Sequence, residues 1–318
     1  MASDTTRPLV TVPDEQWVEL IQRSGPLDGV ELAAWDLHEP HPRADEIRVV
    51  VPPYLDKQQR PELLAELPHL EVVQLLTAGY DNVATHIPAG VRLANAAGVH
   101  DASTAELALT LTLAALRGIP TFVRAQDRGE WQRTQQWPAL ADKRVLVVGY
   151  GNVGRAVVRR LLPFEVEVTA VASKARAGDD LVSEVHGIAE LPALLPHHEV
   201  VVLIVPLTDD TTGLVDEAFL AAMPDGALLV NVARGKVVDT DALVAALTTG
   251  RITAALDVTD PEPLPEDHPL WSAPGVLISP HVGGASTAFL PRALRMVRSQ
   301  LTSYAATGEV EHVVLTGR

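Results

Sequence analysis

The feature that most constrains this chain is an apolar run, a glycine-rich turn and a helix-like segment in direct succession. The run Val145–Val148 is apolar and rich in β-branched residues, as in a buried strand. It leads into Gly149–Gly154, where glycine occupies the first, third and sixth positions, and then into Arg155–Leu162, whose apolar residues recur with helical spacing. This order is typical of a βαβ unit, which predicts an open, mostly parallel sheet.

Each residue of the turn has a physical role in such a unit. Gly149 permits the tight turn, Gly151 has no Cβ to obstruct a phosphate group, and Gly154 lets the helix approach the strand. The amides of Asn152 and Val153 lie at the expected helix N-terminus, where backbone N–H groups bind anions. The turn therefore predicts a site for the pyrophosphate of a dinucleotide. A glycine-rich turn without a ligand is the alternative.

Short apolar runs alternate with helix-like segments along the chain, in two series. The first series has expected strands at Leu9–Val12, Val30–Ala34, Ile47–Val51, Val72–Leu76 and Val91–Ala94. The second has them at Val145–Val148, Val166–Ala172, Val200–Val205, Ala227–Asn231, Ile252–Asp257 and Val276–Ser279. Because 318 residues, 47% of them hydrophobic, suffice for two cores, we predict an α/β fold with two domains. Each has an open parallel sheet flanked by helices, and the second is a Rossmann fold.

The expected domains are not simple halves of the chain. A helical segment at residues 288–306 follows the last expected strand and has no obvious place in the second series. We expect it to return to the first domain. The predicted division is therefore a substrate-binding domain of residues 1–99 plus 288–318 and a dinucleotide-binding domain of residues 100–287.

A long apolar segment, Leu107–Leu116, separates the two series. It follows a capping-box pattern at Ser103–Glu106 and ends at Gly118 and Pro120. Its apolar residues are too many for one face, so we expect burial between domains or across a subunit interface. Burial inside one domain is the alternative. The polar segment Arg124–Asp142 then suits a connecting excursion.

The charge and composition exclude several classes of protein. The net charge is −16, from 41 acidic and 25 basic residues, and such a protein is repelled by nucleic acids and anionic membranes. There is no cysteine, so disulfides, thiolate nucleophiles and cysteine-ligated metal sites are excluded, and we expect no metal. We find no leader-like N-terminus and no run of about 18 apolar residues, so we expect a cytoplasmic protein.

The end of the strand after the glycine turn indicates which dinucleotide is bound. Enzymes that use NAD place Asp or Glu there to accept hydrogen bonds from the ribose hydroxyls. This chain has Ser173, Lys174 and Arg176 instead, with no carboxylate before Asp179. Because a hydroxyl and two cations suit a 2′-phosphate, we predict NADP. The alternative is that NAD binds without its carboxylate and that Lys174 and Arg176 are solvated.

Three side chains with catalytic chemistry follow expected strands of the second series: Arg234, Glu262 and His281. Ligands of open α/β sheets bind at the carboxyl ends of strands, so we expect these side chains to converge. Arg234 can hold a carboxylate, His281 can protonate a developing alkoxide, and Glu262 can stabilise the imidazolium. Asp257 can accept from the nicotinamide carboxamide. The alternatives are a surface histidine, a turn arginine and a solvated glutamate.

These segments resemble the D-isomer-specific 2-hydroxyacid dehydrogenase family, which includes phosphoglycerate dehydrogenase and glyoxylate/hydroxypyruvate reductase. The resemblance extends over most of the chain. The segments that show it are Val73–Asp81, Gly149–Gly154, Val205–Thr208 with Thr211, Asn231–Gly235, Leu256–Pro263, His268–Trp271 and Pro280–Gly284.

The resemblance implies roles for individual residues. It implies that Arg234, Glu262 and His281 are catalytic, with Arg234 and His281 also binding the substrate. It implies that Ala78 and Gly79 offer backbone amides to the substrate carboxylate. The cofactor-binding residues that it adds are Pro206, Thr211, Ala233 and Gly283. It also implies a homodimer, joined through the helix near residues 103–118.

One departure from the NAD-using relatives, and one difference from the phosphite dehydrogenases, indicate a subgroup of the family. Ala172 stands where NAD-using relatives carry the ribose-binding acid, and Ser173, Lys174 and Arg176 resemble the pattern of NADP-preferring glyoxylate reductases. Phosphite dehydrogenases carry a lysine where this chain has Ala78. We therefore predict reduction of glyoxylate, hydroxypyruvate or a similar small anionic 2-oxoacid to the D-2-hydroxyacid with NADPH.

Two other classes of function stay open at the level of sequence. A dinucleotide-sensing regulator of this fold, like the related transcriptional corepressors, would have no significant turnover. A lyase or hydrolase with the dinucleotide as an internal oxidant would consume no NADPH. Four aromatic side chains in loops are candidates for the border of the substrate pocket, with ordinary packing as the alternative. They are Tyr54, His100, Trp137 and Trp271.

Overall fold

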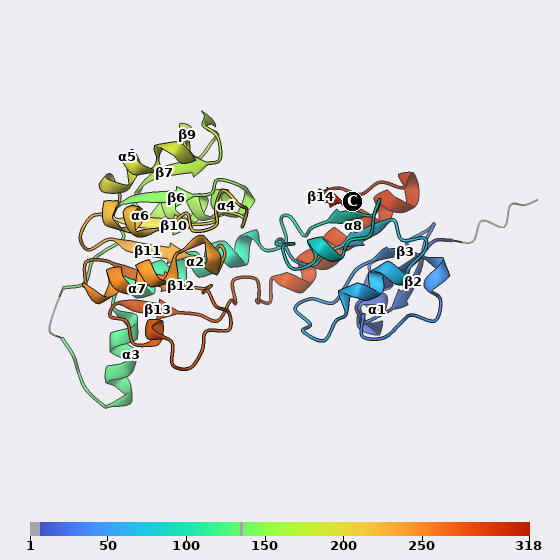
Figure 1. Ribbon diagram of the computed structural model, residues 1–318, viewed down its shortest axis with the longest axis horizontal. Helices are drawn as coiled ribbons and strands as arrows, with labels where there is room; N and C mark the ends of the chain where they lie inside the picture. The colour runs from blue at the N-terminus through green and yellow to red at the C-terminus, as the bar shows by residue number, and fades with distance from the viewer. Residues whose placement is uncertain (1–6, 134–135) are drawn as a thin grey trace, which may run out of the picture. The chain divides into compact units, whose positions relative to one another are not determined.

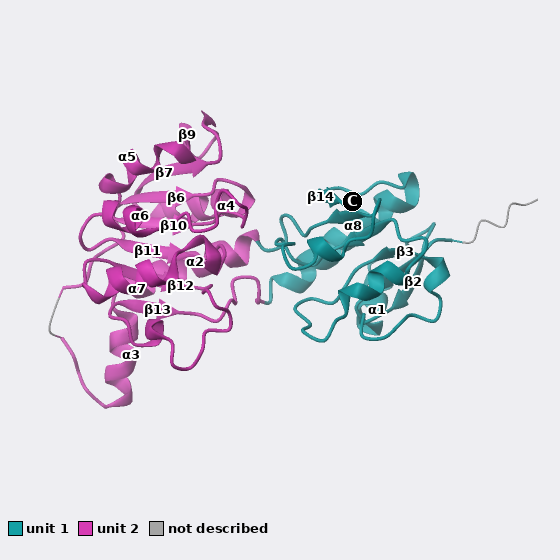
Figure 2. Cartoon of the chain, viewed as in Figure 1, with its two compact units in different colours: residues 1–100, 287–318 teal, residues 101–286 magenta. Residues whose placement is uncertain are grey.

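The computed structural model describes residues 7–133 and 136–318. The chain divides into two compact units (Figure 2). Unit 1 comprises the residues up to His100 together with Thr287–Arg318, and unit 2 comprises Asp101–Ser286. The chain passes from one unit to the other twice, so unit 1 is discontinuous in sequence.

Unit 1 contains a six-stranded sheet in the order β14-β5-β4-β3-β1-β2. Figure 1 labels its strands β2, β3 and β14. Its strands are β1 (Leu9–Val12), β2 (Glu31–Ala34), β3 (Ile47–Val50), β4 (Val72–Gln74), β5 (Arg92–Ala94) and β14 (Val313–Thr316). The first five pair in parallel, whereas β14 is antiparallel to β5. The expected strands of the first series are confirmed, and β14 is a strand that the sequence pattern did not indicate.

Two helices complete the core of unit 1. Helix α1 (Glu15–Arg23) begins after Asp14, whose side chain accepts a hydrogen bond from an amide of the first turn. Helix α8 (Phe289–Thr307) packs in the same buried cluster, where Ile21 of α1 lies with Leu301 of α8. The C-terminal helix therefore belongs to the core of the N-terminal residues.

Unit 2 contains an eight-stranded sheet in the order β13-β12-β11-β10-β6-β7-β9-β8. Its strands are β6 (Arg144–Val148), β7 (Glu167–Ala172), β8 (Arg176–Ala177), β9 (Glu184–Gly187), β10 (Val200–Leu203), β11 (Leu228–Asn231), β12 (Thr253–Leu256) and β13 (Val276–Ile278). All neighbours pair in parallel except β8 and β9, which form an antiparallel hairpin. The predicted α/β fold class, with a Rossmann domain, is confirmed.

Helices cover both faces of this sheet. Helices α2 (Asp101–Leu116) and α4 (Asn152–Leu161) contribute to one buried cluster, and α5 (Leu191–Leu194), α6 (Glu217–Ala222) and α7 (Thr240–Thr248) contribute to the other. Helix α3 (Ile119–Asp127) follows α2. The 3₁₀ helices of the two units are η1 (Ala44–Glu46), η2 (Pro61–Glu66), η3 (Ala84–His86), η4 (Leu162–Phe164), η5 (Ile188–Glu190), η6 (Leu195–His197), η7 (Gly235–Val237) and η8 (Pro269–Trp271).

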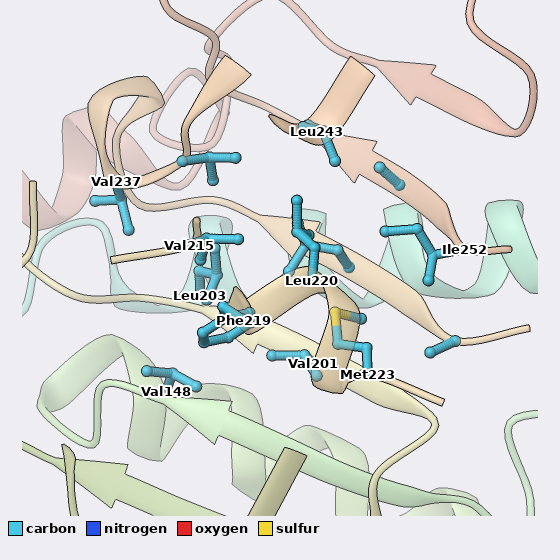
Figure 3. Packing of buried hydrophobic residues seen from close by; sticks show 14 of the residues in the cluster. Val148, Val201, Leu203, Val215, Phe219, Leu220, Met223, Val237, Leu243 and Ile252 are labelled. Carbon is cyan, nitrogen blue, oxygen red and sulfur yellow. The ribbon is translucent and has the colours of Figure 1, made fainter. Parts of the chain in front are cut away.

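Strand β10 shows how the core is divided. Successive side chains of a strand point to opposite faces, and here both faces are buried. Val201 and Leu203 lie in one cluster with Phe219 of α6 (Figure 3), whereas Val200 and Val202 lie in the other. A strand covered on both sides is continuously apolar, which explains why the sequence shows runs of valine and leucine rather than alternation.

The long helix α2 begins earlier than the capping-box pattern predicts. The pattern at Ser103–Glu106 indicates a start after Ser103, but α2 begins at Asp101 and Ser103 is buried inside it. The predicted helix start is therefore wrong. Asp101 supplies a negative charge in the first turn, where it stabilises the helix through its dipole.

The segment after α2 also differs from the expectation. Gly118 adopts a left-handed φ of 65°, and α3 follows at once, so Arg124–Asp127 is helical rather than part of a connecting excursion. Pro120 lies in the first turn of α3. A proline there removes only an N–H group that has no helical partner. Pro120, which suggested the end of the long helix, therefore lies at the start of α3.

Helix α2 is buried largely within unit 2. Ala105, Ala108 and Leu109 lie in one cluster with Val157 of α4. Burial inside one unit, the alternative to an interface, thus accounts for much of its apolar surface. In residues 7–133 and 136–318 no single helix has the length and hydrophobicity to cross a membrane. Helices α2 and α3 reach those values only as a pair, across a bend of 68°.

Candidate active site

The predicted functional residues of unit 2 follow strands of one sheet. The glycine turn follows β6, Arg234 follows β11, Glu262 follows β12 and His281 follows β13. These strands run parallel, so their carboxyl ends lie along one edge of the sheet, where α/β proteins bind ligands. The segments singled out by the sequence therefore leave the sheet on the same side.

The three glycines of the turn meet different surroundings. A Cβ on Gly149 would collide with the carbonyl group of Ile204, and a Cβ on Gly154 would collide with the carbonyl oxygen of Gly149. A Cβ on Gly151 would meet no atom within 4 Å. The first and last glycines are thus required by packing, whereas the middle one leaves space at the N-terminus of α4. That space and the helix N-terminus fit the pyrophosphate of a dinucleotide.

Asp257 holds the segment after β13 in place. The residue is 3% exposed. Its carboxylate accepts hydrogen bonds from Ser279 Oγ at 2.6 Å and from the amides of Val282 and Gly283 at 2.9 and 2.8 Å. Its backbone carbonyl accepts a hydrogen bond from the His281 amide at 2.7 Å. Because a buried carboxylate needs such donors, Asp257 fixes the backbone on both sides of His281.

His281 and Glu262 are in direct contact. The distance between His281 Nδ1 and Glu262 Oε1 is 2.6 Å, and the two side chains are 41% and 42% exposed. His281 has a φ of 54°, a left-handed conformation that histidine tolerates better than most residues. With Nδ1 in contact with the carboxylate, Nε2 is the ring nitrogen that remains available to a ligand.

Arg234 lies in a segment that contacts the loop of Glu262. The neighbouring Gly235 approaches Thr259 so closely that a Cβ would collide with the Thr259 carbonyl group. Thr259 precedes Glu262 by three residues in the loop after β12. The structure thus brings the Arg234 segment against the loop of Glu262, and Glu262 against His281.

The turns after β10 and β11 hold further predicted cofactor residues. Thr211 is 7% exposed, and its Oγ1 donates to the carbonyl of Pro206 at 2.6 Å and accepts from the Thr208 amide at 2.8 Å. The amide of Ala233 donates to Asn231 Oδ1 at 3.0 Å. Both turns are therefore fixed by their own side chains at the carboxyl edge of the sheet.

Comparison with known proteins decides the family. The model of the NAD binding domain of the D-isomer specific 2-hydroxyacid dehydrogenases matches residues 109–283, more than half of the chain. The chain belongs to this family. It is an NAD(P)-dependent oxidoreductase, and the resemblance predicted from its motifs is confirmed.

Similar proteins agree with this assignment. The dehydrogenase is 34% identical over 272 residues to a mouse protein named glyoxylate reductase/hydroxypyruvate reductase, covering 80% of this chain and 82% of that protein. A D-isomer specific 2-hydroxyacid dehydrogenase from Xanthobacter autotrophicus Py2, solved with NADPH and MES, matches with a TM-score of 0.80, 31% identity and 98% coverage of each chain.

A second solved structure is similar over the same extent. It is an NADPH-dependent glyoxylate/hydroxypyruvate reductase from Sinorhizobium meliloti in complex with NADP and malonate. The TM-score is 0.77 and the identity 27%, covering 98% of this chain and 99% of that one. These relatives are named as reductases or dehydrogenases, so the comparisons do not favour the alternative of a regulator without turnover.

The loop expected to contact the ribose is exposed in the dehydrogenase. Ser173, Lys174 and Arg176 are all at the surface. Arg176 is nevertheless held at the glycine turn, because its Nη2 donates to the carbonyl of Tyr150 at 2.7 Å. Sequence reasoning assigned no role to Tyr150; the available signal was a tyrosine between the first two glycines of the turn.

The predicted substrate-binding residues of unit 1 lie in a loop after β4. The carbonyl of Ala78 accepts a hydrogen bond from Asn95 Nδ2 at 2.8 Å, and the carbonyl of Gly79 accepts one from Thr77 Oγ1 at 2.7 Å. Side chains of unit 1 therefore fix the loop through its carbonyl groups.

The four loop aromatic residues make contacts within their own units. In unit 1, the rings of Tyr54 and His100 stack on each other and on Phe289. In unit 2, Trp137 packs edge-on against a phenylalanine of α3. Trp271 is 52% exposed and donates through Nε1 to a backbone carbonyl at 2.7 Å. Packing accounts for three of them, as the alternative interpretation allowed.

Proposed function

We propose that this dehydrogenase reduces glyoxylate, hydroxypyruvate or a similar small 2-oxoacid to the D-2-hydroxyacid, with NADPH as its preferred cofactor. The observation that supports this most is the 2.6 Å contact between Glu262 Oε1 and His281 Nδ1, on the sheet that also holds the glycine turn. The names of the relatives, and the NADP and NADPH bound in the similar structures, support the choice of substrate and cofactor.

Each residue of the proposed centre acts on a different part of the reaction. When bound, the reduced nicotinamide supplies a hydride to the carbonyl carbon. The guanidinium of Arg234 binds the substrate carboxylate and stabilises negative charge on the carbonyl oxygen. His281 donates a proton to that oxygen, and Glu262 orients the ring and stabilises its charged form. The backbone amides of Ala78 and Gly79 are the proposed further ligands of the carboxylate.

The proposed cofactor site has three parts. The pyrophosphate is held by Gly149, Gly151, Asn152, Val153 and Gly154. The nicotinamide half is held by Pro206, Thr211, Ala233, Asp257 and Gly283. The 2′-phosphate is held by Ser173, Lys174 and Arg176, which are exposed. Because solvent weakens such contacts, we expect a preference for NADPH over NADH of about 10–100-fold.

We also propose a cytoplasmic homodimer. An apolar groove of unit 2 supports the dimer, and its lining includes Ile119 and Val123, which are 46% and 51% exposed. Apolar side chains gathered at a surface favour burial against a partner, most simply a second copy. We expect light scattering to give twice the mass of the chain, and the substitution Val123→Glu to halve the measured mass.

The net charge of −16 does not favour binding to an anionic membrane surface.

The test of the reaction is a panel of 2-oxoacids with the purified protein. We expect NADPH oxidation, followed by its absorbance, with glyoxylate or hydroxypyruvate, and a product of D configuration where the product is chiral. Absence of NADPH consumption with every member of the panel would contradict the proposed reaction.

The test of the proton donor is the substitution His281→Ala. We expect turnover to fall by about 10²–10⁴-fold with NADPH binding nearly unchanged, because the alkoxide then lacks its proton. The matched control is His312→Ala, because His312 is a second histidine with a left-handed φ, 58°, and belongs to unit 1. If His281→Ala kept turnover within a few-fold of the wild type, the assignment would be wrong.

A further inference from the structure

Tyr150 contacts the hairpin after β7 through three different groups. Its hydroxyl donates to Asp179 Oδ1 at 2.9 Å, and its carbonyl oxygen accepts from Arg176 Nη2 at 2.7 Å. Its ring centre lies 6.0 Å from the guanidinium carbon of Arg176, within the range of a cation–π contact. Tyr150 is only 6% exposed. A buried residue of the glycine turn therefore holds the hairpin at Arg176 in β8 and at Asp179, just after that strand.

Asp179 is the second anchor of this hairpin. Its Oδ1 accepts from the Leu181 amide at 2.9 Å as well as from Tyr150, and its Oδ2 accepts from Arg155 Nε at 2.7 Å. Arg155 lies in the first turns of α4, directly after the glycine turn. The tip of the hairpin is thus tied to the pyrophosphate turn from two sides.

These contacts also set the local charge. The carboxylates of Asp179 and Asp180 would repel the 2′-phosphate of NADP, but Arg155 forms ion pairs with both carboxylates. In the described part of the chain, neither Lys174 nor Arg176 forms an ion pair with a carboxylate. Their positive charges are therefore left to attract an anion at this edge of the sheet.

We propose that Tyr150 is a positioning residue for cofactor selection: its hydroxyl, bonded to Asp179, ties the hairpin to the glycine turn and so keeps the Arg176 guanidinium in place for the 2′-phosphate of NADP. The inference rests on the proposed preference for NADP. Holding the arginine in advance reduces the entropy lost when the cofactor binds.

The hydroxyl of Tyr150 is suited to this role. Burial, together with the hydrogen bond to Asp179, raises the pKa of Tyr150 to about 12. The group therefore stays protonated and donates to the carboxylate at neutral pH. Removing only this hydroxyl leaves the ring and the backbone carbonyl in place, so Tyr150→Phe separates the anchor to Asp179 from the contacts with Arg176.

The experiment compares kcat and KM for NADPH and NADH in the wild type and in Tyr150→Phe. We expect KM for NADPH to rise by about 3–10-fold, as for one lost hydrogen bond, with kcat at saturating NADPH unchanged. We expect the kcat/KM for NADH to stay within about twofold, because NADH has no 2′-phosphate. Adding Tyr150→Phe to an Asp179→Ala background should change the cofactor preference by less than about twofold, because the shared bond is already lost.

Tyr304→Phe is the matched control. It also removes a tyrosine hydroxyl that donates to a carboxylate, Glu71 Oε2 at 3.0 Å, but it lies in unit 1. We expect it to leave the cofactor preference unchanged. Arg176→Gln is the reference for complete loss of the guanidinium and should lower the preference at least as far as Tyr150→Phe.

The outcomes separate this inference from the proposed function. A wild type without a preference for NADPH overturns the proposed cofactor preference, and the role of Tyr150 with it. A wild type whose preference is lost in Arg176→Gln but kept in Tyr150→Phe overturns only the role of Tyr150. An equal loss with both cofactors in Tyr150→Phe, or a loss that Arg176→Gln does not reproduce, also overturns it, because the effect then does not pass through the arginine.

Discussion

Two aspartates organise two loops at the carboxyl edge of the unit 2 sheet, and they do so in different surroundings. Asp257 is 3% exposed, and its carboxylate accepts from one hydroxyl and two backbone amides. The side chain of Asp179 is 31% exposed, and its donors include the side chains of Arg155 and Tyr150. The loop of His281 is therefore held by neutral donors away from water, and the hairpin of Arg176 by charge at the surface.

This difference in exposure indicates which of the two loops tolerates substitution. Removing a buried acceptor leaves its donors without partners in a place that water does not reach, which is costly. Removing an exposed one lets water replace it. We therefore expect the loop that holds His281 to be intolerant of substitution, and the hairpin that is proposed to contact the cofactor to tolerate it.

The largest expected effect is that of Asp257→Asn. The new amide nitrogen would face backbone N–H donors, so we expect the free energy of unfolding to fall by about 2–4 kcal/mol and turnover to fall by about 100-fold. Denaturant unfolding and kcat measure the two quantities. Asp179→Asn is the comparison, and a similar loss of stability in both variants would show that burial is not what distinguishes the two loops.

A smaller effect is expected from salt. Contacts between exposed charges weaken as the Debye length shrinks to about 3 Å near 1 M salt. We expect the preference for NADPH over NADH to fall by about 3–10-fold over this range, and kcat with saturating NADPH to change by less than about twofold. Steady-state kinetics with both cofactors at increasing NaCl measures this. A preference for NADPH that did not depend on salt would show that the contacts of the hairpin are shielded from solvent, as those of Asp257 are.

Acid should remove a contribution of Asp179 to stability. The hydrogen bonds from Arg155 first, and then from the Leu181 amide, hold the pKa of Asp179 well below its ordinary value of 3.8. Because this pKa is lower in the folded chain than in the unfolded one, the stabilisation is complete above about pH 4 and is lost as the pH falls further. We expect the Tm values of the wild type and Asp179→Asn to differ at neutral pH and to approach each other progressively as the pH falls below about 4. A difference in Tm that did not shrink in acid would contradict this origin.

The smallest expected effect concerns a buried polar group that has no hydrogen-bond partner in the described residues. Thr11 is 0% exposed, and in the described residues its Oγ1 has no hydrogen-bond partner. We expect Thr11→Val to raise the free energy of unfolding by about 1 kcal/mol, because a methyl group replaces an unsatisfied hydroxyl. Urea unfolding measures it. A clear loss of stability would mean that the hydroxyl is hydrogen bonded in solution.

The fold class, the family and the strands of both series could be predicted from the sequence, and the ends of these strands lie within two residues of those expected. These properties are local: an apolar run between turns, or a glycine that no other residue can replace, depends on its near neighbours. The start of α2 did not follow, because charge at a helix end competes with the capping pattern. The strands β8, β9 and β14 did not follow either, because their pairing partners, rather than their own residue patterns, make them strands. Strand β14, for example, pairs with β5 from the other end of the chain.

Which side chains contact each other depends on the tertiary structure. The sequence indicated residue types suited to proton donation and anion binding, but the contact of Glu262 with His281 depends on two strands bringing their loops to one edge. The bond between Tyr150 and Asp179 likewise depends on how a hairpin folds back onto the glycine turn. A hydrogen bond requires two atoms to lie about 3 Å apart, and such a distance between remote residues is set by the packing of the whole sheet.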